Sequence, residues 1–326
     1  MVYRTGVLVL LAKIGIESNR RSLLPRFPLS IEVPSLLTDF HDVEETAFPS
    51  RPDGRIVIEN TRSALWDYAF SRGKAVFRGP YQFYEKSASD MRFTFWGNQG
   101  YLYRCVLSVL ESRHAVFSFH AAGLYDPAKN RLYIVAGGAG SGKTVFLLSG
   151  ISRGLKLFST ETVHFRLDKS GPTWFKGSLV DNVRIGTLVR DFPGFCPRGV
   201  RDLAEAEVWK NKIALDLSSF QSGPDTLLQP EIVIIFPRIE EGRRGFVATL
   251  LSDRRKAAKV VFDNISQKIA ETVVLYDRVA IPGFDNAPLA RARLKASEAL
   301  VKDRSVRTAV SVLSNPAECW GDLTCI

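Results

Sequence analysis

Apolar residues recur along this 326-residue chain in two different spacings. Short runs rich in β-branched and aromatic residues, which are typical of strands, lie at 7–12, 55–59, 74–84, 91–96, 115–119, 132–135, 155–158, 163–167, 212–217 and 232–236. Longer stretches with an apolar residue at every third or fourth position predict helices at 101–113, 253–272 and 288–301. Because strands and helices alternate through most of the chain, we expect an α/β fold.

The first 100 residues differ from the rest, since they predict strands and irregular loops. We therefore divide the chain into a mostly β N-terminal module, residues 1–100, and a second domain, residues 101–326. The opening apolar run from Val7 to Ala12 follows Arg4 and so resembles a weak signal peptide, but Lys13 interrupts it. The run is too short to span a bilayer, so we interpret it as a buried strand and expect no membrane span.

Composition and charge narrow the function only a little. With 45% hydrophobic and 24% charged residues the chain is globular, which excludes disordered and collagen-like proteins. Its net charge of +10 would suit a nucleic acid, an acidic membrane surface or an acidic substrate. The basic residues are scattered in pairs with acids between them, and no long basic arm is present. A nucleic acid is therefore not the partner that we expect, because an anionic nucleotide explains the charge as well.

The four cysteines indicate a reducing compartment. Cys105 and Cys196 are far apart in the sequence, and no CxxC pair or zinc-finger spacing occurs. Cys319 and Cys325 could form a disulfide, which the sequence cannot decide. We interpret the cysteines as reduced, mostly structural thiols and expect a cytoplasmic protein.

One stretch carries a strong chemical signal. The sequence LYIVAGGAGSGKTVFLLS, from Leu132 to Ser149, reads as a strand, a glycine-rich turn and a helix around the pattern GxxxxGK[ST]. This is the context that a phosphate-binding P-loop requires. The residues of the pattern are Gly137, Gly138, Ala139, Gly140, Ser141, Gly142, Lys143 and Thr144.

The glycines of this loop explain why it would bind a polyphosphate. A loop that wraps phosphates must point several backbone N–H groups inward, through conformations that a Cβ would obstruct. The helix that follows adds unpaired N–H groups and its positive dipole end. Lys143 would reach the β and γ phosphates of ATP, and the hydroxyl of Thr144 would bind Mg²⁺. The alternative is a flexible glycine turn before an ordinary helix.

Four further residues are candidates for chemistry, each with a structural alternative. Glu161 follows a strand beside the loop, where a metal ligand or a catalytic base is usual, or is a solvated turn carboxylate. His120 ends a strand of the hairpin that leads into the loop, and is either functional or simply buried. Arg238 ends a central strand and could contact the transferred phosphate, or pair with acids on the surface. His164 faces either the site or the core.

The segment from Phe119 to Phe165, FHAAGLYDPAKNRLYIVAGGAGSGKTVFLLSGISRGLKLFSTETVHF, resembles the HPr kinase/phosphorylase family. The resemblance implies a P-loop kinase core related to phosphoenolpyruvate carboxykinase, which moves the γ-phosphoryl group of ATP onto a hydroxyl, usually that of a serine. It gives Lys143 and Thr144 the phosphate and metal roles, and His120 matches the histidine of the family. Hexameric assembly in that family makes a homo-oligomer an expectation.

The chain departs from this family at its acids. Glu161 falls where the family has the second of two neighbouring aspartates, and Thr160 falls where it has the first. The arginine–glycine signature of the family is reduced to an echo, VRIGTLV, around Arg184 and Gly186. One of the two acid roles, holding the metal or accepting the hydroxyl proton, is thus left without a residue.

We expect an ATP- and Mg²⁺-dependent kinase that acts on a serine or another hydroxyl of a protein, peptide or small molecule. Lys143, Glu161, His120 and Arg238 are its candidate catalytic residues, and Thr144 and Glu161 its candidate metal ligands. Two alternatives remain open. A degraded kinase would bind nucleotide as a regulator without transferring phosphate, and a nucleic-acid-associated NTPase would explain the positive charge.

Overall fold

The computed structural model describes residues 1–27, 39–63, 65–71, 73–138, 140–200, 205–240, 242, 244–321 and 323, with the backbone alone for 205–206 and 307–310. The chain forms two compact units. The first unit contains Met1–Phe117 and Gln267–Ala290, and the second contains Ser118–Ser266 and Arg291–Ile326. Mixed α/β structure with a strand-rich N-terminus is confirmed.

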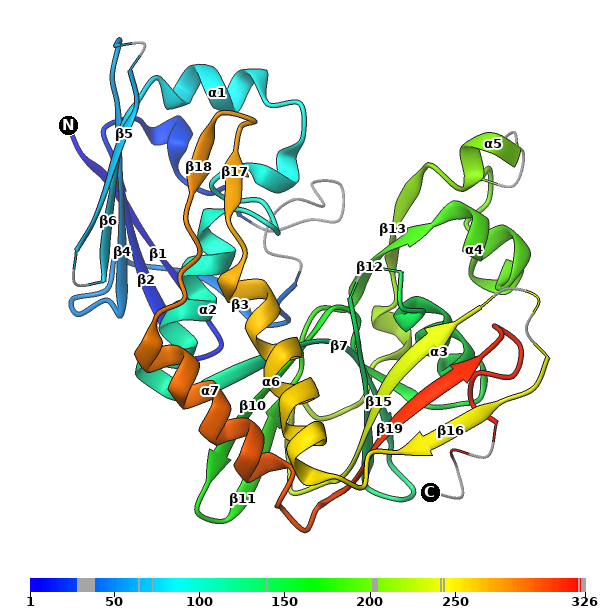
Figure 1. Cartoon of the computed structure of the whole chain (residues 1–326). Coiled ribbons are helices and arrows are strands. Elements are labelled where there is room, and N and C mark those ends of the chain that lie inside the picture. The colour runs from blue at the N-terminus through cyan, green and yellow to red at the C-terminus, as the bar shows by residue number, and fades with distance from the viewer. Residues whose placement is uncertain are drawn as a thin grey trace. The chain divides into compact units, whose positions relative to one another are not determined.

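The first unit is built on a sheet that has six strands among the described residues, in the order β3-β1-β2-β4-β6-β5 (Figure 1). Its strands are β1 (Tyr3–Val9), β2 (Ala12–Ser18), β3 (Val43–Thr46), β4 (Gly54–Asn60), β5 (Asp67–Ser71) and β6 (Lys74–Gly79). The opening segment therefore forms a strand, as the sequence predicts, and pairs with β2 as a hairpin. The long helix α2 (Tyr101–His114) packs against β2 and β4, with its apolar side buried.

The strand predicted at 74–84 is present only as far as β6 (Lys74–Gly79), and the strand predicted at 91–96 is wrong. Residues 81–84 lie in helix α1 (Tyr81–Ser87), which begins after Pro80, and residues 91–93 form a short 3-10 helix. Both segments belong to a cluster of aromatic rings in which Tyr81 contacts Phe77 and Phe95. Aromatic residues favour strands in general, but here their burial against other rings decides the local structure.

A segment from far along the chain completes the first unit. The hairpin of β17 (Val273–Leu275) and β18 (Val279–Ile281) carries Tyr276 at its turn. The backbone N–H of Phe95 donates to the Tyr276 hydroxyl at 3.0 Å, and that hydroxyl donates to Glu85. The unit therefore ends at Phe117 and regains residues 267–290, whereas the sequence-based division is at residue 100.

The second unit is built on a nine-stranded sheet, counted over the described residues, in the order β14-β11-β10-β7-β8-β15-β19-β16 with β9 paired to β7. Its strands are β7 (Val116–Asp126), β8 (Arg131–Ala136), β9 (Lys156–Ser159), β10 (Thr162–Asp168), β11 (Gly171–Phe175), β14 (Thr226–Leu228), β15 (Glu231–Ile239), β16 (Val247–Leu250) and β19 (Val306–Ser314). Strands β12 (Val180–Arg184) and β13 (Lys212–Asp216) form a separate ribbon. The helices are α3 (Lys143–Ser152), α4 (Ile185–Arg190), α5 (Glu205–Val208), α6 (Arg254–Ala270) and α7 (Ala287–Leu300), the last two shared with the first unit.

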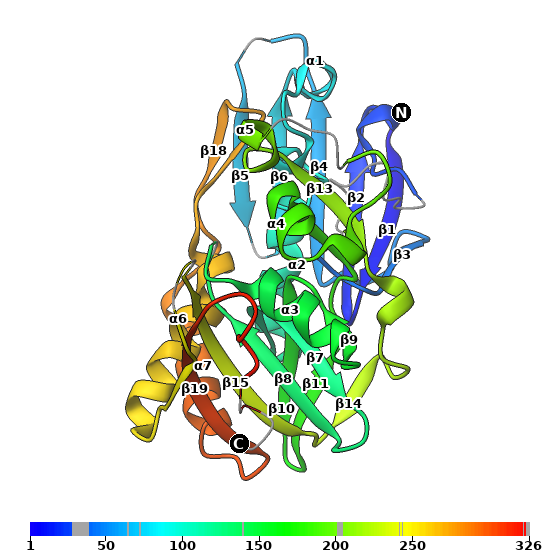
Figure 2. The same cartoon turned by 90° about the vertical axis from the view of Figure 1, so that its right-hand side faces the viewer.

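The centre of this sheet is parallel. Strand β15 pairs in parallel with β8 on one side and with β19 on the other, and its residues Ile232 to Ile235 are fully buried (Figure 2). The continuous β-branched run predicts such a central strand, because parallel strands are covered on both faces. Strand β8 and strand β15 therefore end at the same edge of the sheet, where the glycine-rich loop begins.

The C-terminal segment is docked on helix α3. Trp320 is 1% exposed, and its indole Nε1 donates to the carbonyl of Phe146 at 2.9 Å. Cys105, Cys196 and Cys319 are buried free thiols, while Cys325 lies outside the described residues. Among the helices that the structure describes, none is both long and apolar enough to cross a membrane.

The segment that connects β11 to β12 passes very close to the backbone at the start of β10. A Cβ on Gly177 would overlap the carbonyl oxygen of Thr162, at the start of β10. Any larger residue must push apart two backbone segments, one of which leads into β12. By contrast, a Cβ on Gly194 would meet no other atom within 4 Å.

We expect Gly177→Ala to lower the free energy of unfolding by about 1 to 3 kcal/mol, the usual cost of inserting a methyl group into a packed site. Urea unfolding monitored by circular dichroism measures the loss. Gly194→Ala is the matched control and should be nearly neutral. Equal stability of the two variants would contradict this account of the β11–β12 connection.

Candidate functional site

The glycine-rich loop lies between the end of β8 at Ala136 and the start of α3 at Lys143. Gly140 and Gly142 have φ angles of +80° and +100°, which L side chains rarely adopt. A Cβ on Gly142 would in addition overlap the side chain of Ile239. Both glycines are therefore required by the backbone path, and Ala139 lies outside the described residues.

Helix α3 begins without a side-chain cap or an acidic residue of its own. Gly142 precedes it and has no side-chain cap, and the first turn contains no acidic residue. The early N–H groups of such a helix, together with its dipole, favour an anion in front of it. The expected strand and helix are thus present on either side of the glycine-rich loop.

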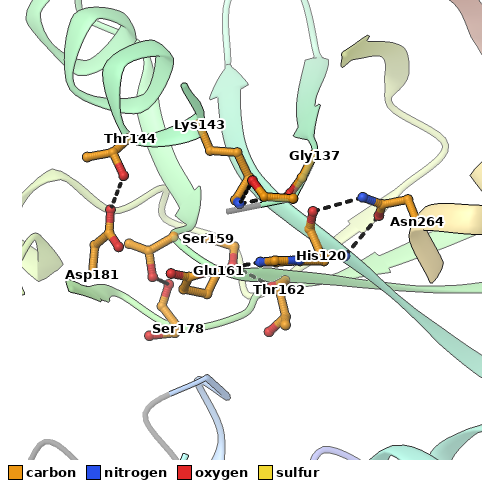
Figure 3. Close-up of polar contacts among 12 residues, drawn as sticks. His120, Gly137, Lys143, Thr144, Ser159, Glu161, Thr162, Ser178, Asp181 and Asn264 are labelled. Atoms are coloured by element: carbon orange, nitrogen blue, oxygen red, sulfur yellow. Dashed lines mark hydrogen bonds and ion pairs between the residues drawn. The ribbon is translucent and has the colours of Figure 1, made fainter. Parts of the chain in front are cut away.

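The Lys143 ammonium is held above this loop (Figure 3). Its Nζ donates to the carbonyl of Gly137 at 2.8 Å and to that of Gly138 at 3.1 Å. A Cβ on Gly137 would overlap the Ser141 side chain, so the loop folds tightly on itself. The cation therefore lies over the backbone that would surround a phosphate.

Asp181, which the sequence analysis did not identify, contacts the first turn of α3. The Thr144 hydroxyl donates to Asp181 Oδ2 at 3.1 Å, and Asp181 is only 2% exposed. Burial raises the pKa of Asp181 to about 7, and the negative charge of Glu161 contributes to the rise. The bond from Thr144 and the ammonium group of Lys143 act in the opposite direction. The structure therefore brings two carboxylates, from different parts of the chain, to one site.

Thr160 has a structural role that explains where Asp181 lies. Its N–H donates to Ser178 O at 2.8 Å, and its hydroxyl donates to Ser178 O at 3.1 Å and to Val180 O at 2.7 Å. The residue at the family's first acid position thus binds the start of β12, which carries Asp181. A weak sequence signal existed, because Asp181 shares one face of a strand with buried Val183.

Glu161 and His120 face each other across the site. Glu161 lies in the tight turn between β9 and β10, and its Oε2 is 3.4 Å from His120 Nε2. The Glu161 side chain is 27% exposed and that of His120 only 7%. The N–H of Ala121 donates to the carbonyl of Glu161 at 3.0 Å, which joins the two segments. The pair therefore offers one accessible carboxylate supported by a buried imidazole.

Strand pairing places His120 beside the loop. Ala121 on β7 is opposite Ala136 on β8, so His120 lies at the end of the hairpin that continues into the loop. The N–H of Gly137 donates to the His120 carbonyl at 3.3 Å. The predicted place of His120 beside the loop, at the open end of the hairpin, is thus confirmed, but the residue lies inside β7 and does not end the strand.

His164 belongs to the core. It is fully buried, with Nδ1 2.7 Å from Ser118 Oγ and Nε2 3.4 Å from Thr162 Oγ1. Burial lowers the pKa of His164 to about 3, so the ring is neutral. Of the two alternatives for this residue, the structure supports the core position.

Arg238 lies near the loop in the fold but faces solvent. It is on β15 next to Ile239, yet its side chain is 77% exposed and its Nε is 2.8 Å from Glu240 Oε1. This is the surface ion pair that was the alternative for Arg238. Arg184, from the echo of the family signature, donates instead to the Trp209 carbonyl at 2.6 Å.

The oxygen atoms of the site fit a magnesium ion. Thr144 offers a hydroxyl, while Asp181 and Glu161 offer carboxylates whose mutual repulsion a cation would relieve. Among the described residues, no group of three or more histidine, cysteine, aspartate or glutamate side chains could hold a metal. Mg²⁺ usually takes one or two carboxylates from a protein and completes its shell with water and phosphate oxygens.

No protein-family model and no curated protein matches this sequence.

The raised pKa of Asp181 makes a prediction about stability. Its pKa is about 7 in the folded chain and about 4 when unfolded, so ionising it costs stability as the pH rises through this interval. Asp181→Asn removes that ionisation and keeps an oxygen for Thr144. We expect the variant to be more stable than the wild type at pH 8 by a few kcal/mol, and to have little advantage near pH 4.

Urea unfolding at about pH 4 and pH 8 in buffers without divalent ions measures the effect. Glu298→Gln, which neutralises an exposed carboxylate on α7, is the control and should show no such dependence. A loss of stability at both pH values in Asp181→Asn would contradict the proposed cost of burying this charge.

Proposed function

We propose that this chain is an ATP- and Mg²⁺-dependent kinase of the HPr-kinase type that transfers the γ-phosphoryl group to a hydroxyl. One observation carries the proposal. The hydroxyl at the start of α3 is bound to a buried carboxylate, and a second, accessible carboxylate lies beside it with a histidine in support. Phosphoryl transfer needs a phosphate loop, a metal site and a base in this proximity.

The glycine-rich loop would bind the triphosphate. Its amides and the first turn of α3 supply N–H donors, and the Lys143 ammonium, which contacts the Gly137 and Gly138 carbonyls, would turn to the phosphates. The flanking strand and helix support this role, since they hold the two ends of the loop at one edge of the sheet.

Thr144 and Asp181 would hold the magnesium ion, with Glu161 at its side. The ion would supply charge neutralisation on the phosphate oxygens. Asp181 suits this position because it is bonded to Thr144 and buried, and a nearby cation would stabilise its ionised form. The negative charges of Asp181 and Glu161 would attract the ion, and the bound ion would neutralise them.

Glu161 would accept the proton of the acceptor hydroxyl. It is the more exposed of the two carboxylates, so an acceptor can reach it, and His120 orients it from the buried side. This division gives each acid one task, one at the metal and one at the hydroxyl. Arg238 receives no task in transfer, because its guanidinium pairs with Glu240 at the surface.

The alternative of a degraded kinase, which would bind nucleotide without transferring phosphate, rested on the apparent lack of a second acid in the sequence. Asp181 weakens that reason, because it supplies a second carboxyl group whose charge interacts with that of Glu161. A purely regulatory protein would bind ATP and transfer its phosphate to nothing. The nucleic-acid-associated NTPase finds no support in the site beyond the overall charge. A cytoplasmic location, where ATP is abundant, and a homo-oligomer are part of the proposal.

Lys143→Ala should weaken Mg²⁺-ATP binding and lower phosphoryl transfer by at least about 100-fold, as expected for loss of a cation at the transferred group. Calorimetry with Mg²⁺-ATP and incubation of γ-labelled ATP with peptide, protein and small-molecule hydroxyl acceptors test both. Lys169→Ala, at an exposed lysine in the β10–β11 turn, is the control. Unchanged binding and transfer in Lys143→Ala would refute the proposal.

Glu161→Gln should separate binding from chemistry. We expect ATP affinity within a few-fold of the wild type and a fall in the transfer rate of about 100-fold or more, the usual contribution of a general base. Affinity from calorimetry and rate from single-turnover labelling give the two values. A variant that binds and transfers like the wild type would show that the proton goes elsewhere.

A further inference from the structure

Asn264, a polar residue on the buried side of α6, makes an unusual contact with the candidate site. It is 8% exposed, although it stands next to Ile265 on a helix whose other inward residues are apolar. Its Oδ1 accepts from the backbone N–H of His120 at 2.9 Å, and its Nδ2 donates to the His120 carbonyl at 3.1 Å (Figure 3). One side-chain amide thus satisfies both backbone groups of the site histidine.

The peptide groups that flank His120, which Asn264 binds, also bond the glycine-rich loop and the segment that carries Glu161. The His120 carbonyl also accepts from the N–H of Gly137, the first residue of the glycine-rich loop. The next N–H, that of Ala121, donates to the carbonyl of Glu161. The loop, the histidine and the accessible carboxylate therefore meet at backbone atoms whose orientation Asn264 restrains.

The free-energy cost of burying an asparagine indicates that this contact has a specific role. A buried asparagine is costly unless its amide is bonded, and the two bonds it makes here are to one residue only. An apolar side chain would pack in α6 equally well, but it would leave the N–H of His120 without this acceptor. The residue thus holds one backbone position at a defined angle.

We infer that Asn264 is a positioning residue for His120 and, through it, for Glu161 and the entry of the glycine-rich loop. This inference rests on the proposed function, since the reaction that it affects is phosphoryl transfer from ATP. Asn264 touches neither nucleotide nor acceptor. Its role is to keep the His120–Glu161 pair in the geometry that the reaction needs.

The first test does not depend on activity. The chain has four histidines, so labelling with ¹⁵N-histidine gives four backbone amide signals, and His120→Gln identifies that of residue 120. In Asn264→Leu we expect hydrogen exchange of the His120 amide to accelerate at least about 10-fold, because its buried acceptor is lost, while the His164 amide is unchanged. Ile265→Ala, which removes buried packing from the neighbouring residue of α6, should not affect His120 selectively.

The second test measures turnover of γ-labelled Mg²⁺-ATP. In Asn264→Leu we expect kcat to fall about 10- to 100-fold with KM for ATP nearly unchanged, as for other residues that orient a catalytic group. In a double-mutant cycle, the losses of His120→Gln and Asn264→Leu should be clearly less than additive, because part of the effect of Asn264 passes through the His120 ring. Ile265→Ala should retain kcat, and independent losses in the cycle would indicate a merely structural role.

Each outcome decides a different point. If exchange at the His120 amide is not selectively faster in Asn264→Leu, the positioning role is wrong, whether or not the chain is a kinase. If exchange accelerates but turnover equals that of Ile265→Ala, the role in the reaction is wrong and the proposed kinase stands. If the wild type itself neither binds nor consumes ATP, the proposed function fails, and the role of Asn264 in turnover fails with it.

Discussion

The site depends on the cost of placing two negative charges next to each other with one of them buried. Asp181 is almost inaccessible to solvent, and its carboxylate is opposed by that of Glu161. The hydroxyl of Thr144 and the ammonium of Lys143 offset only part of this cost. Such an arrangement is stabilised by a proton or a metal ion, and carboxyl groups with a strongly raised pKa are found at functional sites.

Strand direction explains how residues from distant parts of the chain reach this point. Parallel β8 and β15 end at one edge, and antiparallel β7 brings His120 to the same edge. The β9–β10 turn carries Glu161 to this edge. Thr160, in the same turn, donates hydrogen bonds to the start of β12 and so positions Asp181. Asn264 then closes the arrangement from α6. Backbone hydrogen bonds therefore connect the segments that carry His120, Glu161 and Asp181.

Local patterns were sufficient for much of the fold. The predicted helix at 101–113 and the strands around 55–59, 132–135 and 232–236 are present with small shifts at their ends. Aromatic residues at 81–84 and 91–96 misled the prediction, because ring packing with Tyr276 and Phe95 outweighs strand propensity there. The first unit could not be delimited either, since its hairpin at 273–281 is far away in sequence.

The amino acids alone identify the glycine-rich loop, its lysine and threonine, and the hairpin that places His120 beside it, because these depend on short spacings and on backbone conformations that only glycine adopts readily. The folded chain was needed to show that Asp181 is the partner of Thr144, that His164 belongs to the core and that Arg238 pairs with Glu240. Charge and burial depend on which strands become neighbours. That pairing is a long-range property, which no local spacing of residues records.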